Sequence, residues 1–320
     1  MAPATGLWRQ TPPAIFPPIM GLFGLGLAWR QGLAAFGLPQ GLAEALLGAV
    51  TLLFLFALVA WLAKPLRRVS VVAEELRILP GRAGLAAGSL CLMLLAAVLV
   101  PYAPGAARGL GFLALAVHAG LAVLLVRVLL AGPEEGRVVT PVFHLTFVGF
   151  ILWPLSAVPL GMEGAARAVL WATMPVAGAI WAISLWQIIT RIPPAPLRPL
   201  LAIHLAPASL FSIVATALGM TGLAEFWAFA GGAILLALVA TGGWLTASGF
   251  SALWGALTFP LAAYATALLA LGRASGDQTV ALGGALVLMA ATLIVPAIAV
   301  QVLRLWARGT LAQATNAARV

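Results

Sequence analysis

Long apolar stretches, separated by short polar segments, repeat along nearly the whole chain. A helix needs about 20 apolar residues to cross the roughly 30 Å hydrocarbon core of a bilayer. Dividing the sequence at its charged residues and its proline and glycine clusters gives ten such stretches. They comprise residues 14–37, 41–63, 83–101, 109–131, 141–161, 164–190, 198–220, 223–244, 246–272 and 279–306. The pattern predicts an all-α integral membrane protein with ten transmembrane helices in a single domain, residues 1–320, and a short polar tail at each end.

Composition supports a membrane environment and excludes several classes of function. Hydrophobic residues make up 63% of the chain and charged residues 8%, whereas a soluble domain is about half apolar and about one quarter charged. The net charge of +9 comes from basic residues scattered between apolar runs, so we expect no nucleic-acid surface. The single cysteine, Cys91, lies in an apolar run and excludes a disulfide or a cysteine-based metal site within one chain. We therefore expect no metal and no cofactor.

The distribution of lysine and arginine predicts the orientation, because cytoplasmic loops keep the excess of basic residues. With ten spans and the N-terminus inside, 13 basic residues are cytoplasmic and 4 lie on the opposite face. The cytoplasmic set is Arg9, Lys64, Arg67, Arg68, Arg77, Arg82, Arg127, Arg137, Arg191, Arg198, Arg304, Arg308 and Arg319, and the opposite set is Arg30, Arg108, Arg167 and Arg273. Both termini, and the two short tails, are predicted to be cytoplasmic.

Prolines distinguish the odd-numbered spans from most of the even-numbered ones. The odd spans begin 50 to 70 residues apart, roughly, which indicates five helical hairpins in series. Every odd span carries a proline, including Pro18, Pro154, Pro207 and Pro260, whereas the sixth and tenth alone of the even spans do. A proline inside a helix removes a hydrogen bond and kinks it, and in a membrane the freed backbone must be buried in protein or face water. We expect the kinked odd spans to form an inner ring around a cavity, although prolines are also commoner in membrane helices generally.

Ionisable residues are nearly absent from the middle of the predicted spans. All eight acids fall in loops or within about a turn of a span end, which disfavours strong coupling to a cation, since coupled transport usually needs a buried carboxylate. His144 and His204 lie in odd spans near the cytoplasmic end, where a partly protonated imidazole attracts an anion or senses pH. The alternative is a histidine that only bonds a neighbouring helix.

Nothing in the sequence supports an enzyme, since no nucleophile stands in a motif such as G-x-S-x-G. Gly21, Gly24 and Gly26 in the first span permit close helix packing or leave space along a pore wall, and we favour packing. The basic cytoplasmic mouth, with Arg67, Arg68, Arg191 and Arg198, raises the local concentration of anions. Arginines at a membrane surface also serve as topology or lipid-headgroup residues.

Several short motifs resemble the tellurite-resistance/dicarboxylate transporter family, which includes bacterial TehA-type channels, malate permeases and the plant guard-cell slow anion channels. The motifs are Phe-Pro-Pro at 16–18, Lys-Pro at 64–65, Pro-Leu-Arg-Pro at 196–199, Leu-Ala-Pro-Ala at 205–208 and Phe-x3-Trp-x3-Thr-Phe-Pro at 250–260. The resemblance covers essentially the whole chain and implies five hairpins with pseudo-fivefold symmetry around a central pore, in each subunit of a homotrimer.

The same resemblance implies what the pore does. A phenylalanine of the ninth span closes it, and the motif places this gate at Phe259, with Phe250 as the second candidate. The implied function is a channel for small inorganic or carboxylate anions in the bacterial cytoplasmic (inner) membrane. The alternative is a proton-linked exporter or transporter of C4-dicarboxylates or tellurite.

Overall fold

The computed structural model describes residues 8–320 and shows a bundle of helices. The first seven residues of the predicted N-terminal tail lie outside this range. The long helices are α1 (Phe16–Ala35), α2 (Gly41–Arg67), α4 (Leu79–Leu99), α5 (Pro104–Ala131), α7 (Glu163–Thr190), α8 (Leu205–Ala217), α9 (Thr221–Ala240), α11 (Thr258–Ser275) and α12 (Gln278–Ala307). Four short helices are α3 (Val71–Arg77), α6 (Pro154–Ala157), α10 (Gly242–Leu245) and α13 (Leu311–Ala314). The remaining turns are the 3-10 segments η1 (Pro13–Ile15), η2 (Glu134–Arg137), η4 (Gly149–Leu152), η5 (Ala195–His204) and η6 (Ala252–Leu257) and the π-helical η3 (His144–Val148).

Within residues 8–320, eight helical segments are long and apolar enough to cross a membrane. Two of them join a 3-10 segment to an α-helix, η5 with α8 and η6 with α11. Two of the ten predicted spans do not meet this description. α1 carries two prolines near its start and Arg30-Gln31 near its end, which lower its mean hydropathy. The predicted span 141–161 is a shorter apolar segment, His144–Ala157, that passes through three kinds of helix. The multi-pass membrane architecture is therefore plain, and the count of ten remains a prediction.

Burial separates the predicted inner spans from the outer ones. In its most apolar stretch α4 is 89% buried, and the η5–α8 and η6–α11 segments are each 78% buried. The corresponding values are 28% for α2 and α7, 22% for α5, 17% for α9 and 33% for α12. The third, seventh and ninth predicted spans thus lie in the interior, and the five even-numbered predicted spans, which are α2, α5, α7, α9 and α12, cover them. This is the division that the proline pattern predicted, but the prolines inside continuous helices, Pro65, Pro175 and Pro296, belong to covering helices.

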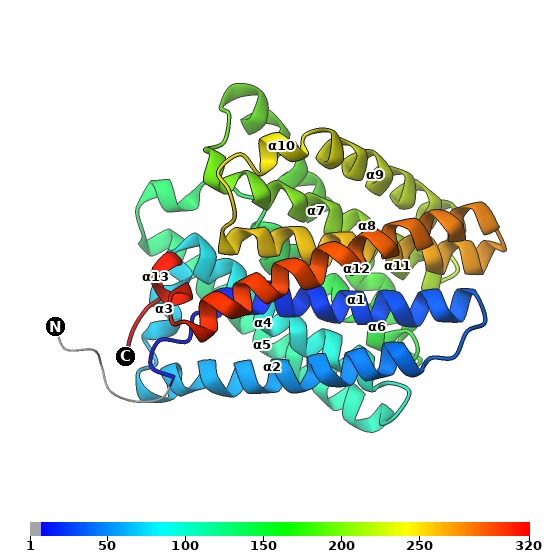
Figure 1. Cartoon of the computed structure of the whole chain (residues 1–320), viewed down its shortest axis with the longest axis horizontal. Coiled ribbons are helices and arrows are strands. Elements are labelled where there is room, and N and C mark those ends of the chain that lie inside the picture. The colour runs from blue at the N-terminus through cyan, green and yellow to red at the C-terminus, as the bar shows by residue number, and fades with distance from the viewer. Residues whose placement is uncertain (1–7) are drawn as a thin grey trace.

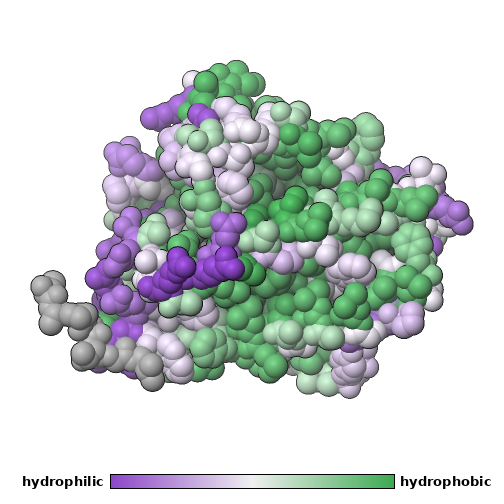
Figure 2. All heavy atoms as spheres, viewed as in Figure 1, coloured by the Kyte–Doolittle hydropathy of each residue, from purple (hydrophilic) through white to green (hydrophobic). Residues whose placement is uncertain are grey.

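The outward faces of the covering helices are strongly apolar. On α9, Phe229 is 81% exposed, and Leu236 and Val239 lie open beside it. Figure 2 shows apolar residues across the middle of the visible face, with polar residues gathered at the two ends of the long axis. An exposed apolar surface of this extent is unfavourable in water and suits the hydrocarbon core of a bilayer.

Contacts between charged residues identify the two polar ends of the bundle. The backbone nitrogen of Val320 donates to the carbonyl oxygen of Arg9 at 3.3 Å, so the first and last described residues lie at the same end, called here the terminal end (Figure 1). The Arg68 guanidinium donates to the carbonyl oxygen of Arg319 at this end. At the opposite end, Arg30 pairs with Glu44 at 2.7 Å. Arg9, Arg68 and Arg319, three of the basic residues assigned to one side by the sequence, therefore lie together at the terminal end.

Prolines of the inner segments lie at junctions rather than inside continuous α-helix. Pro207 and Pro260 are each the third residue of an α-helix that follows a 3-10 segment, and Pro154 is the first residue of α6 after η4. Pro18 is likewise the third residue of α1, directly after η1. In the first turn of a helix the amide hydrogen has no intrahelical partner, so a proline removes no bond there. The predicted kinks thus take the form of changes from 3-10 or π geometry to α geometry.

Two glycines allow α1 and α11 to pack closely. A Cβ atom added at Gly21 would lie 2.2 Å from the Thr258 Oγ1 atom, and one added at Gly24 would lie 2.9 Å from the Phe259 Cδ2 atom. Gly26 has the same role toward Leu47 of α2, at 2.5 Å. Close packing is therefore the reason for all three glycines, and it brings the start of α11 against the middle of α1.

Candidate pore

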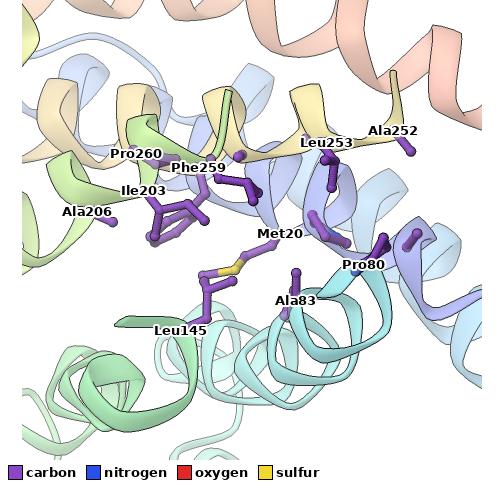
Figure 3. Close-up of a pocket in the computed structure, with 16 residues that line it drawn as sticks. Met20, Pro80, Ala83, Leu145, Ile203, Ala206, Ala252, Leu253, Phe259 and Pro260 are labelled. Carbon is purple, nitrogen blue, oxygen red and sulfur yellow. The ribbon is translucent and has the colours of Figure 1, made fainter. Parts of the chain in front are cut away.

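Three small cavities follow one another through the interior of the bundle. The first lies toward the terminal end and is lined by residues of α1, α4, α8, α11, η5 and η6 (Figure 3). The second lies between η3, η4, α1 and α8, and the third reaches Leu27 and Leu94 toward the opposite end. Met20 and Leu145 belong to both the first and the second cavity, and Leu152 to both the second and the third. The shared walls show that the three cavities adjoin one another, and the series is called here the path.

Of the described residues, Phe259 alone lines all three cavities. Its side chain is 5% exposed, and in Figure 3 it points from α11 into the space that Met20 and Leu145 also reach. Phe259 is the second residue of α11, so the change from η6 to α11 fixes where its ring enters the path. The ring thus forms part of the wall of every section.

The path is closed to ions in this conformation. The three cavities measure about 40, 20 and 20 Å³. A single water molecule needs a cavity of about 10–15 Å³ on this measure of volume, so each cavity holds no more than a few waters. A hydrated ion does not fit, and opening must move side chains.

The walls of this path are almost entirely apolar. Glycine, alanine, proline, leucine, isoleucine, valine, methionine and phenylalanine make up the lining, and the two polar side chains on the three walls are His144 and Thr266. The Thr266 hydroxyl donates to the carbonyl oxygen of Ala262 at 3.1 Å and so faces its own helix. None of the eight acidic residues lines any of the three cavities. Such a wall offers an ion no strong binding site.

The second phenylalanine that the sequence proposed as a gate lies elsewhere. Phe250 precedes η6 and packs against Trp254 with their ring centroids 5.5 Å apart. It lines none of the three cavities. Of the two candidates, Phe259 is therefore the one on the path. Among the prolines, Pro260 lines the first cavity and Pro207 the second, whereas Pro18 and Pro154 lie behind the walls.

The two histidines predicted near the cytoplasmic end form a pair. The Nε2 atom of His144 lies 3.0 Å from the Nδ1 atom of His204, which requires one donor and one acceptor. The other ring nitrogens, Nδ1 of His144 and Nε2 of His204, are buried without a partner. Trp181 lies against His144 and donates its indole N–H to the carbonyl oxygen of His204 at 3.2 Å. The pair is therefore held rigidly, with His144 at the wall of the second cavity.

The four arginines predicted at the cytoplasmic mouth have separate surroundings. Arg68 pairs with Glu74, and this contact lowers the pKa of the Glu74 carboxyl. Arg198 lies 4.4 Å above the Trp244 ring and donates to the carbonyl oxygen of Pro193. Arg67 ends α2, and Arg191 follows α7 beside a different cavity. All four lie off the path, so their effect on an ion inside it acts through the electric field alone.

Arg82 is the basic residue that the sequence did not single out. Its side chain is 6% exposed and donates to the carbonyl oxygens of Leu76, Gly136 and Arg77, at 2.6, 3.0 and 3.3 Å. No carboxylate of the described chain pairs with it. On the same turn of α4, Ala83 lines the first cavity. The sequence placed Arg82 in a loop, one residue before a predicted span, and gave no signal that its charge is buried beside the path.

A second buried charge is fully compensated. The Lys64 ammonium lies 2.5 Å from the Glu75 carboxylate, and neither side chain is exposed. Lys64 also donates to the carbonyl oxygen of Thr11, and Glu75 accepts from the backbone nitrogen of Ala318. Burial raises the pKa of the Glu75 carboxyl despite the ammonium beside it. Sequence analysis placed Glu75 in a loop; the structure shows that it ties α2, α3 and the two ends of the described chain together.

Comparison with known proteins gives one clear result. The family model described as voltage-dependent anion channel matches residues 10–303, nearly the whole chain. No curated protein matches the sequence. The matched range contains all three cavities, the histidine pair and Arg82.

Proposed function

Because the chain belongs to the voltage-dependent anion channel family, a family of anion channels and transporters within the tellurite-resistance/dicarboxylate group, we propose that it is a passive channel for small anions. In this proposal the pore is the path through the three cavities, and the ring of Phe259 closes it. The observation that carries the proposal is that Phe259 lines every section of this path.

The preference for anions has a physical source in the buried charge of Arg82. A helix is roughly 10–12 Å across with its side chains, and we take about 10 Å as the separation between the Arg82 charge and an ion in the first cavity. At an effective dielectric constant of about 20, this gives about 1.7 kcal/mol in favour of an anion and the same against a monovalent cation. The difference of about 3 kcal/mol corresponds to a preference on the order of a hundredfold. Since Arg82 does not line the path, it does not trap the ion.

The absence of acidic residues from the path supports passive flow. A transporter coupled to protons or sodium needs a group that binds the coupling ion during the cycle, and such groups are usually buried carboxylates. On the described path, the one ionisable side chain is that of His144. We propose that the pair of His144 and His204 adjusts conduction with pH. If neutral glutamine at both positions leaves the current unchanged between about pH 5 and 8, where imidazole titrates, this part of the proposal is wrong.

Three further features belong to the same proposal. We propose ten transmembrane passes, with α1 and the broken segment 144–157 as the two that composition alone does not identify. The terminal end is cytoplasmic, because the larger set of basic residues lies there. The assembly is a homotrimer in the bacterial cytoplasmic membrane, each subunit having its own pore. Cysteine labelling from each side of the membrane tests the orientation, and mass measurement of the detergent-solubilised protein tests the assembly.

Ion flux in reconstituted vesicles tests the channel proposal. A channel carries chloride or nitrate down an electrical gradient alone and gives current in planar bilayers under ion substitution. A proton-linked transporter of dicarboxylates or tellurite instead responds to a pH gradient without a bulk current. Current that needs a pH gradient, or the absence of anion flux from folded protein with Phe259 replaced by alanine, would contradict the proposal.

A further inference from the structure

A fourth cavity lies outside the pore, at the end of α7. Its volume is about 450 Å³, several times that of the three pore cavities together. It lies between the last two turns of α7, the loop that follows this helix, and the extended residues 138–141 before η3. Leu200 belongs both to this cavity and to the first pore cavity. An occupant would therefore touch a side chain of the pore wall.

The walls of this cavity are mostly apolar and open toward the surface. Ile188, Leu197 and Leu201 contribute apolar surface inside. At the rim, Ile192 is 70% exposed and Trp186 is 65% exposed. Because α7 is one of the outer helices, whose side chains face the bilayer, a lipid chain can enter the cavity from the side.

Two hydroxyl groups inside the cavity have no hydrogen-bond partner. Ser184 is 4% exposed, and its Oγ atom is buried without a partner, as is the Oγ1 atom of Thr140 on the facing segment. Thr173 and Thr190 of the same helix bond the carbonyl oxygens of Val169 and Trp186, four residues earlier. A buried hydroxyl is normally satisfied, so these two donors indicate an acceptor that belongs to a bound molecule.

A positive charge stands at the outer end of the same cavity. Arg191 is the first residue after α7 and lines the cavity with its exposed side chain. It lies seven residues beyond Ser184, about 10 Å further along the helix axis toward the terminal end. Arginine matches phosphate geometrically through paired hydrogen bonds. From inside to outside, the cavity thus presents apolar walls, hydroxyl donors and a phosphate-binding side chain.

We propose that this cavity is a binding site for an anionic glycerophospholipid. An acyl chain lies between the apolar walls, an ester carbonyl oxygen accepts a hydrogen bond from Ser184 or Thr140, and the phosphate contacts Arg191. The order of these groups along α7 is the order in which a phospholipid places them from the bilayer core to its surface. Lipid binding is independent of the proposed channel function, because it needs no ion flux to be detected.

Native mass spectrometry of the purified full chain tests the site. Protein is incubated with phosphatidylglycerol or phosphatidylcholine, and retained lipid is counted for the wild type, Arg191→Gln and Ser184→Leu. Arg308→Gln is the matched control, because Arg308 also caps the end of an outer helix with an exposed side chain but lines none of the cavities described here. The wild type and the control should retain phosphatidylglycerol in preference to phosphatidylcholine. Arg191→Gln should reduce that preference roughly fivefold or more.

Three results would overturn the proposal. Ser184→Leu fills the cavity and removes a donor, so unchanged lipid retention by this variant would place the lipid elsewhere. Equal losses in Arg191→Gln and Arg308→Gln would show unspecific attraction to the charged end. Ser184→Ala, which removes the hydroxyl without adding bulk, serves if the leucine variant does not fold. If Ile192→Asp dissociates an oligomer and the wild type retains no lipid, a second copy of the chain covers this face instead.

Discussion

Replacing Phe259 with alanine is the most direct perturbation of the proposed gate. The ring is 5% exposed and lines each of the three cavities. On the side of α1 the ring faces Gly24, where an added Cβ atom would lie 2.9 Å from the Phe259 Cδ2 atom. The work of opening is therefore taken as the work of displacing this ring.

The size of the effect follows from what opening requires. Moving the ring off its rotamer costs about 0.5–1.5 kcal/mol, and exposing a buried phenylalanine costs about 1.5–3 kcal/mol. Together these give about 2–4.5 kcal/mol, which corresponds to a rise in conductance of roughly 30-fold to 2,000-fold when the ring is absent. The same substitution removes core contacts and can lower stability by about 3–5 kcal/mol, so folding must be measured on the same sample.

Single-channel and macroscopic currents in planar bilayers give the measurement. Phe259→Ala should conduct chloride at the raised conductance given above without any stimulus. The conductance of Phe259→Leu should lie between those of the wild type and Phe259→Ala. Phe250→Ala is the matched control, because it removes a phenylalanine from the segment before η6, which lines none of the three cavities. If folded Phe259→Ala protein carries no more current than the wild type and Phe250→Ala, the ring does not close the pore.

Three further predictions concern other residues of the described chain. Gly24→Ala places a methyl group 2.9 Å from the Phe259 ring and should shift the gate, so bilayer recordings should show a changed open probability; an unchanged value would mean that the ring does not move. Arg82→Gln should lower the anion-to-cation permeability ratio about tenfold or more. Arg82→Lys keeps the charge and should leave this ratio unchanged; reversal potentials in salt gradients measure the ratio for both variants. Lys64→Met leaves the Glu75 carboxylate buried and unpaired and should lower the free energy of unfolding by about 3–5 kcal/mol, which a lower thermal midpoint would show. The double variant that also carries Glu75→Leu should recover much of this lost stability.

The electrostatic arrangement separates selectivity from binding. A charged side chain on the pore wall would attract anions and also hold them, which slows conduction. In this structure the uncompensated Arg82 charge is bound to three carbonyl oxygens behind the wall of the first cavity. Its field reaches the path while apolar side chains form the surface. In the proposed channel, this division lets an apolar path favour anions over cations.

Sequence reasoning pointed to part of the candidate site and missed the rest. The Thr-Phe-Pro motif singles out Phe259, which lines all three cavities, and its role as a gate stays a prediction. The pairing of His144 with His204 joins residues 60 positions apart, and no periodicity reports such a contact. Arg82 and Glu75 were assigned to loops because charges next to apolar stretches usually are solvated; both are buried.

The sequence by itself determined that the chain resides in a lipid bilayer and that it is built of helices. Runs of apolar residues have to be helical in lipid, because every backbone group must be hydrogen-bonded within its own segment, and the basic residues had to gather at one end. These properties depend on local composition, so they can be read without coordinates. The division into buried and covering segments also had a local signal in the prolines.

Tertiary structure alone decided where the path runs and what faces it. Which side of α11 carries the Phe259 ring depends on where η6 changes into an α-helix and on the absence of a side chain at Gly24 of α1. Whether an arginine is solvated or buried depends on which carbonyl groups other segments bring to it, as Leu76 and Gly136 do for Arg82. Both are consequences of packing between distant segments, and packing is a property of the folded chain rather than of any one stretch of sequence.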